Sequence, residues 1–173
     1  MLICKVARTA AAVLALLACA AMVVSAQEGD AVKKEMPEMT GFRADMLHRF
    51  GEDAEKALSL AEAMPQEKFT WRPAEGVRSV SDVYMHITGA NIFFPTLIGG
   101  KMPEGMDFAK ARKLEKETTA KKDVINYLKE SIKGIQNLVA NMEDSDLDKE
   151  VDVFGTKSTY RGVLLLLCGH LSE

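Results

Sequence analysis

Cysteine is scarce in this sequence of 173 residues, which contains only three. Cys4 and Cys19 lie within the first 26 residues, so Cys168 is the one cysteine in the rest of the chain. Since a disulfide needs two cysteines, no internal disulfide is expected in the folded part, and Cys168 is interpreted as a small core residue. The domain must then be stabilised by its hydrophobic core or by a bound metal.

Several common functional motifs are also absent from the sequence. Lysine and arginine form no basic patch and the formal net charge is −3, so nucleic acid is not expected as a partner. There is no glycine-rich phosphate loop, no Gly-x-Ser-x-Gly segment, no paired-cysteine zinc motif and no His-Glu-x-x-His segment. These absences exclude the usual signatures of nucleotide binding, serine hydrolysis and zinc proteolysis.

Residues 1–26 have the features of a secretory signal peptide. Lys5 and Arg8 form a short positive start, an uncharged apolar run covers residues 10–24, and Ala26 is a small residue at the cleavage position. We therefore expect an exported protein, periplasmic or extracellular, with no membrane span after cleavage. Two alternatives stay open: an uncleaved membrane anchor, for which the run is short, and a lipid anchor on Cys19.

The remaining chain is expected to form one helical domain. Residues 27–38 are polar and unpatterned, which is typical of a flexible linker, and residues 39–173 are long enough for a single core. Apolar residues recur at helical spacing in four segments, namely 40–64, 79–98, 119–141 and 159–173. Because each helix buries one apolar stripe best against the others, the sequence predicts an all-α four-helix bundle.

Details within these segments give further expectations. Ser79 stands three positions before Asp82, which is typical of a capping box at a helix start. The prolines and glycines that follow predict a kink at Pro95, an end at residues 99–100 and a long crossover loop. The charged residues before the third helix are interpreted as a solvated face. The apolar run 163–167 predicts a central fourth helix.

Three histidines are present, and two of them occupy unusual positions. His86 shares a helical row with Val83, and His170 shares one with Leu166, so both imidazoles are predicted to point inward. A buried imidazole costs free energy unless its nitrogens find partners, which a metal ion and an outer acceptor would supply. A hydrogen bond to protein groups is the alternative, and it stays open. His48 is expected at the surface.

One tract resembles the DinB-like family. Trp71-Arg72-Pro73 is followed by Gly76-Val77-Arg78-Ser79 and by the helix that carries His86. In that family a loop of this pattern leads into a helix with an inward histidine. The turn at residues 145–148 and the final helix ending Gly169-His170-Leu171-Ser172-Glu173 resemble the family's last helix. The likeness extends from about residue 41 to the end.

The resemblance implies an up-up-down-down bundle with a long crossover between the second and third helices. It also implies a divalent metal, commonly zinc or nickel, held by one histidine on the second helix and a His-x-x-x-His pair on the fourth. His86 would be the first ligand and His170 the first of the pair. The third ligand would follow Glu173, so the resemblance implies a C-terminally truncated chain with an incomplete fourth helix.

The resemblance further implies a metal-dependent hydrolase or transferase acting on a small molecule that the sequence does not identify. Two other readings stay open. One is a non-catalytic helical bundle of the cell envelope that binds a partner or a small molecule. The other is an inactive fragment without its metal. A homodimer is also left open.

Overall fold

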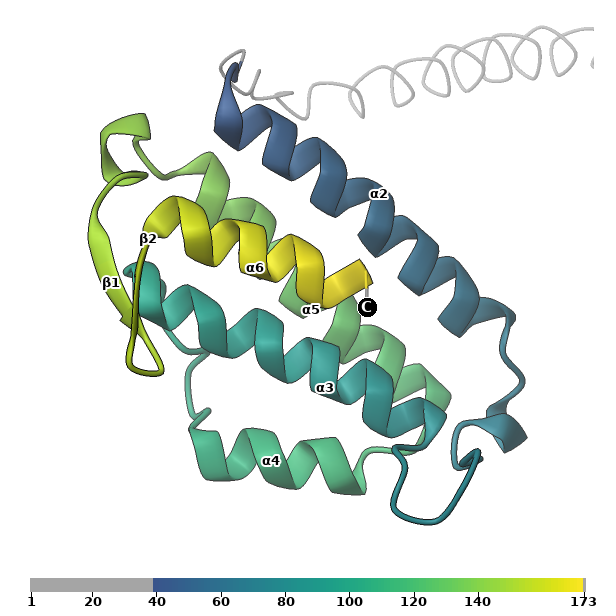
Figure 1. The fold of residues 1–173 in the computed structure, drawn as a ribbon. Coiled ribbons are helices and arrows are strands. Elements are labelled where there is room, and N and C mark those ends of the chain that lie inside the picture. Colours follow the sequence, from purple (N-terminus) through teal and green to yellow (C-terminus); the bar gives the residue numbers. More distant parts are fainter. Residues whose placement is uncertain (1–38, 173) are drawn as a thin grey trace, which may run out of the picture. The chain divides into compact units, whose positions relative to one another are not determined.

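The structure, a computed structural model, describes residues 39–172, so the predicted signal peptide and the linker at 27–38 lie outside the described residues. Within residues 39–172 the chain forms five α-helices: α2 Phe42–Ala63, α3 Val80–Phe93, α4 Phe108–Glu117, α5 Lys121–Ala140 and α6 Tyr160–Ser172. A hairpin of β1 Glu150–Val153 and β2 Thr156–Thr159 precedes α6 (Figure 1). The fold is mostly helical, as predicted, but it has five helices rather than four. None of these helices is long and apolar enough to cross a membrane.

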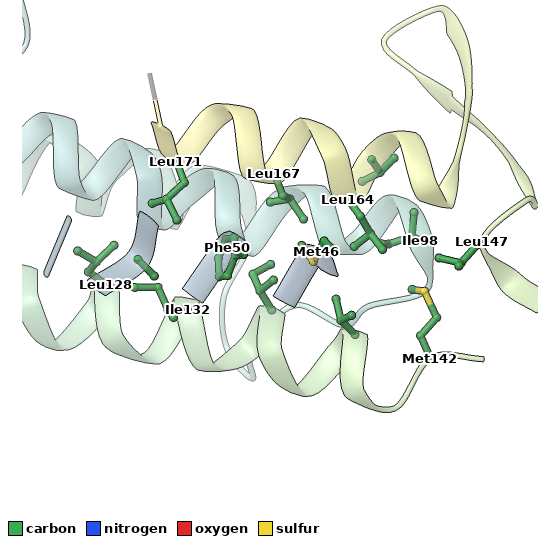
Figure 2. Packing of buried hydrophobic residues seen from close by; sticks show 14 residues of the cluster. Met46, Phe50, Ile98, Leu128, Ile132, Met142, Leu147, Leu164, Leu167 and Leu171 are labelled. Atoms are coloured by element: carbon green, nitrogen blue, oxygen red, sulfur yellow. The ribbon is translucent and has the colours of Figure 1, made fainter. Parts of the chain in front are cut away.

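The helices form a bundle in which α5 and α6 lie between α2 and α3. Both α2 and α3 pack on α5 and on α6, and α4 lies beyond α3 on the outside (Figure 1). The main core fills the space between α2, α5 and α6, where Phe50, Leu128 and Leu164 are fully buried (Figure 2). Helices α2 and α3 therefore hold α6 in place from two sides.

Helix α4 was not predicted, because the segment around it was interpreted as a crossover loop followed by a solvated face. Asp107 caps this helix by accepting a hydrogen bond from the Lys110 backbone N–H at 2.7 Å. No residue of α4 is fully buried, and only the half-buried Leu114 reaches an apolar cluster. The apolar signal is therefore sparse, since six of the ten residues of α4 are lysine, arginine or glutamate.

Helix α3 begins with the capping box that was predicted at Ser79, but it ends at Phe93 and does not continue through a kink at Pro95. Ser79 Oγ accepts a hydrogen bond from the Asp82 N–H, and the Asp82 carboxylate accepts one from the Ser79 N–H, both at 3.1 Å. The α-helix stops at Phe93, and the chain tightens into a 3₁₀ turn over Phe94–Ile98 that contains Pro95. Gly99 then ends the turn with a φ of 86°.

Helix α6 is less central than predicted. Leu164 and Leu167 are fully buried, whereas Leu165 and Leu166 are 56% and 41% exposed. The helix packs on its neighbours with one side only, so the run of five apolar residues does not mean burial all round. In the loop before α3, Trp71 is 55% exposed, whereas Phe69 is buried.

Strands β1 and β2 form an antiparallel hairpin between α5 and α6. Val153 pairs with Thr156, which leaves Phe154 and Gly155 as a two-residue turn. Both have positive φ, 55° and 85°. A two-residue turn with positive φ at both positions is a type I′ turn, which strongly favours asparagine or glycine at its first position. A phenylalanine there is an unfavourable choice for the backbone.

Candidate functional site

The structure brings His86 and His170 together from separate helices. The centroids of their rings are 5.1 Å apart and the ring planes meet at 66°. His86 lies on α3 and His170 in the last turns of α6, and these helices pack on each other. Two imidazoles that are 84 positions apart in the sequence therefore share one location on the bundle.

The pair lies at the edge of the core and not in its interior. The side chain of His86 is 37% exposed, and its row-mate Val83 is 44% exposed. The prediction of an inward row on α3 is therefore wrong in part. The buried residues of α3 are instead Ser81, Met85, Thr88 and Asn91, and α3 packs on α5. His86 lies on the flank of α3, where one ring edge meets α6 and another part meets α4.

Two charged groups that the sequence did not single out contact His86. Its Nδ1 lies 3.2 Å from Nη2 of Arg78 and 3.4 Å from Oε1 of Glu115 on α4. Arg78 and Glu115 also pair with each other at 3.3 Å. A guanidinium only donates and a carboxylate only accepts, so the tautomer of His86 decides which contact is a hydrogen bond. With the proton on Nδ1 the ring donates to Glu115, and Nε2 keeps a free lone pair.

A connected group of rings extends from the histidine pair, and we call it the aromatic face: His86, His170, Phe93, Phe94, Phe108 and Phe154. The Phe94 ring is 6.0 Å from the His170 ring, and Phe93 stacks on Phe154 at 5.5 Å. Phe108 of α4 meets Phe93 edge-on at 5.1 Å. Phe108 and Phe154 remain 53% and 76% exposed, so the chain of rings runs from the half-buried histidines out to solvent.

The spacing of the two imidazoles is compatible with one shared divalent ion. A Zn–N bond is about 2.0–2.1 Å, which puts two imidazole centroids on a tetrahedral ion roughly 5 Å apart. The observed separation is 5.1 Å. Within residues 39–172 there is no group of three or more histidine, cysteine, aspartate or glutamate side chains that could hold a metal ion. The described part of the chain thus brings two imidazoles together, with the Glu115 carboxylate beside one of them.

The other two candidates from the sequence lie away from the pair. His48 is on the surface, as predicted, with its side chain 78% exposed and Nε2 3.6 Å from Glu52. Cys168 is half-buried, and its thiol donates weakly to the Met46 carbonyl at 3.9 Å. Burial raises the pKa of this thiol, with Asp53 adding to the rise, so the reactive thiolate is disfavoured.

The fold and the histidine pair together define a class of protein. It is a helical bundle with a long crossover, in which an imidazole from the helix before the crossover meets an imidazole from the last helix. The family model of the DinB superfamily matches residues 49–173. The chain therefore belongs to the DinB superfamily, which confirms the resemblance seen in the sequence.

Solved structures with the same fold come from several bacteria. A DinB-like protein from Bacillus cereus is 17% identical with a TM-score of 0.60, covering 74% of this chain and 82% of its own. A DinB-like protein from Bacillus subtilis is 22% identical with a TM-score of 0.56, at 73% and 81% coverage. An uncharacterised protein from Escherichia coli is 17% identical with a TM-score of 0.55, at 78% and 88%. No curated relative matches the sequence.

Proposed function

We propose that His86 and His170 bind a divalent metal ion, zinc or nickel, and that the protein is an exported metal-dependent hydrolase or transferase. The observation that supports this most is the 5.1 Å separation of two rings contributed by different helices. The family resemblance implies a third imidazole ligand, which the described residues do not bring to the pair. When bound, such an ion acidifies a water or thiol that it coordinates.

The neighbours of His86 have defined roles in this proposal. Glu115 accepts a hydrogen bond from Nδ1–H and so fixes the tautomer in which Nε2 carries the lone pair, as outer carboxylates do for many metal-binding histidines. Arg78 holds the same carboxylate in place at 3.3 Å. The Phe94 ring beside His170 limits the approach of water from one side.

Calorimetric titration with zinc tests the proposal. We expect His86→Ala to weaken zinc binding by roughly a hundredfold or more, since loss of a ligand exceeds the tenfold to hundredfold typical of outer-shell partners. His48→Ala is the matched control, because His48 is exposed and remote from the pair. One histidine appended after Glu173 should raise the affinity. Equal zinc affinity of the His86 and His48 variants would contradict the proposal.

The exposed rings favour a second candidate function, a non-catalytic bundle of the cell envelope. Phe108 and Phe154 present apolar surface to solvent, which commonly marks an interaction site. The partner could be a second copy of the chain, giving a homodimer. Two experiments distinguish the candidates. If the protein binds metal, zinc should raise its melting temperature, and His86→Ala should remove this effect. If it is a non-catalytic binding bundle, zinc should leave the melting temperature unchanged and Phe154→Ala should change self-association in sedimentation.

A further inference from the structure

A hollow lies beside α3, away from the histidine pair. It has a volume of about 560 Å³ and opens between the end of α3, the crossover that follows it and α5. Its walls are mostly apolar, with Ile92, Pro95, Met106 and Leu138 among the lining residues. Asn91, which also lines it, stands five positions after His86 and so about 140° around the helix. The hollow is therefore separate from the histidine pair.

Two buried polar side chains line this apolar hollow. Asn91 is 4% exposed and Ser131 is 6% exposed. Nδ2 of Asn91 donates a hydrogen bond to Ser131 Oγ at 3.2 Å, and Ser131 Oγ donates to the Leu128 carbonyl at 2.8 Å. Because the only hydroxyl proton of Ser131 goes to Leu128, Ser131 must accept from Asn91. This fixes the orientation of the Asn91 amide, with its NH₂ group on Ser131.

The amide oxygen of Asn91 is left as an acceptor at the hollow. Among the described residues, the side-chain hydrogen bond of Asn91 is the one that its Nδ2 makes. This oxygen is not one of the fully buried side-chain atoms without a partner among the described residues, so it is open to water in the hollow. A molecule in the hollow that carries an O–H or N–H group would supply the donor.

We propose that this hollow binds a small, neutral, mostly apolar molecule with one hydroxyl or N–H donor, as a phenol has. The volume lies in the range of small-molecule sites, which are apolar with a few placed polar groups. Lys101 and Glu130 both line the hollow and carry opposite charges, so neither sign of ligand charge is favoured. The site stands independently of the metal proposal, because it uses a different face of α3 and none of the residues around His86.

Binding of 2-naphthol and of naphthalene to the full chain tests this site. The two probes have the same ring system and differ in the hydroxyl donor. We expect 2-naphthol to bind about tenfold or more tightly than naphthalene, because a site built to pair a hydroxyl rejects the analogue that lacks one. Asn91→Leu should abolish the difference between the probes in calorimetric titration. Equal affinities of both probes for the unaltered chain would overturn the proposal.

Two glycine variants keep the test decisive even if Asn91→Leu does not fold. Gly134 lines the hollow from α5, and nothing lies within 4 Å of a Cβ added there. Gly134→Leu should therefore fill the hollow and abolish 2-naphthol binding while improving helix propensity. Gly51→Leu is the matched control on α2, where an added Cβ also meets nothing within 4 Å, and it should bind normally. Retained binding in Gly134→Leu, with a normal circular dichroism spectrum, would refute the site.

Discussion

The core and the aromatic face use similar apolar side chains in opposite ways. In the core, Phe50, Ile135 and Leu167 are fully buried between helices. On the aromatic face, Phe154 and Phe108 contact other rings and yet remain 76% and 53% exposed. The core therefore gains stability from its apolar groups, whereas the aromatic face keeps much of its apolar surface in water.

The backbone beneath Phe154 sharpens this contrast. Its φ of 55° is strained for a bulky residue, by an amount of order 1–3 kcal/mol, and asparagine or glycine would relieve the strain. No residue of the core shows a positive φ, since among non-glycine residues of the described part only Phe154 does. The backbone preference of the residue is thus overruled at the exposed end of the aromatic face, and natural proteins break such local rules mainly at functional sites.

The largest expected effect contrasts two neighbours on α6. Leu167→Ala should lower the free energy of unfolding by about 2–5 kcal/mol, because it removes a fully buried side chain and leaves a cavity. Leu166→Ala, one position away and 41% exposed, should change it by about 0.5 kcal/mol or less. Urea denaturation measures both. Similar losses in the two variants would mean that the core does not end where the structure puts it.

The next effect concerns the aromatic face. If the metal proposal holds, Glu115→Gln should weaken zinc binding by about tenfold to a hundredfold, because a neutral amide holds Nδ1–H of His86 less well. Glu117→Gln on the same helix is the control, since its carboxylate is 63% exposed and lies 3.9 Å from Lys113. Calorimetric titration compares them. Identical zinc affinities would remove Glu115 from the site.

A smaller effect concerns the cap of α3, the helix that contacts both the core and the aromatic face. Ser79→Ala should cost about 1 kcal/mol of folding free energy, because it removes the oxygen that caps the Asp82 N–H. Ser59→Ala on the exposed side of α2 should be neutral in the same denaturation experiment. A neutral Ser79 variant would show that the capping box adds nothing to the helix.

The smallest effect is the pH dependence of that cap. Burial raises the pKa of Asp82, but hydrogen bonds from Ser79 and the Arg72 guanidinium at 2.7 Å outweigh it, so the net pKa is lowered. A lowered folded-state pKa gives stability that is present above the unfolded-state pKa and is lost as pH falls through the folded-state value. The stability difference between the native chain and Asp82→Asn should therefore shrink below a pH of about 4. Arg72→Gln should weaken this dependence, and a difference that stays constant with pH would contradict it.

Much of the fold could be predicted because its signals are local. Helical periodicity located α2 and α5, and the serine–aspartate spacing located the start of α3. The positions of both histidines on helices followed from the same periodicity. The 5.1 Å between their rings did not, because it depends on how α3 and α6 pack.

The missed features depend on tertiary contacts. Helix α4 has a capping signal at Asp107, but its apolar residues are too few for periodicity to reveal it. Glu115 therefore looked like one charge in a solvated run, although it lies 3.4 Å from His86. Recognising Asp107 and Lys110 as a helix start would have placed Glu115 on a helical face with Ala111 and Phe108. The contact of Phe154 with Phe93 needed the hairpin, whose second strand is polar and carries no strand signal.

Helix α4 is weakly anchored, and it carries Glu115, which contacts His86. Motion of this helix therefore changes the surroundings of the imidazole. Since none of its residues is fully buried, α4 is expected to open more often than α5, and its amides should exchange with deuterium sooner. Each opening would carry Glu115 away from His86 and leave Arg78 as the remaining charged neighbour of Nδ1. The ring would then favour the opposite tautomer, with its proton on Nε2. If the metal proposal holds, fluctuations of this surface helix would set how much of the time His86 presents the Nε2 lone pair that a metal needs.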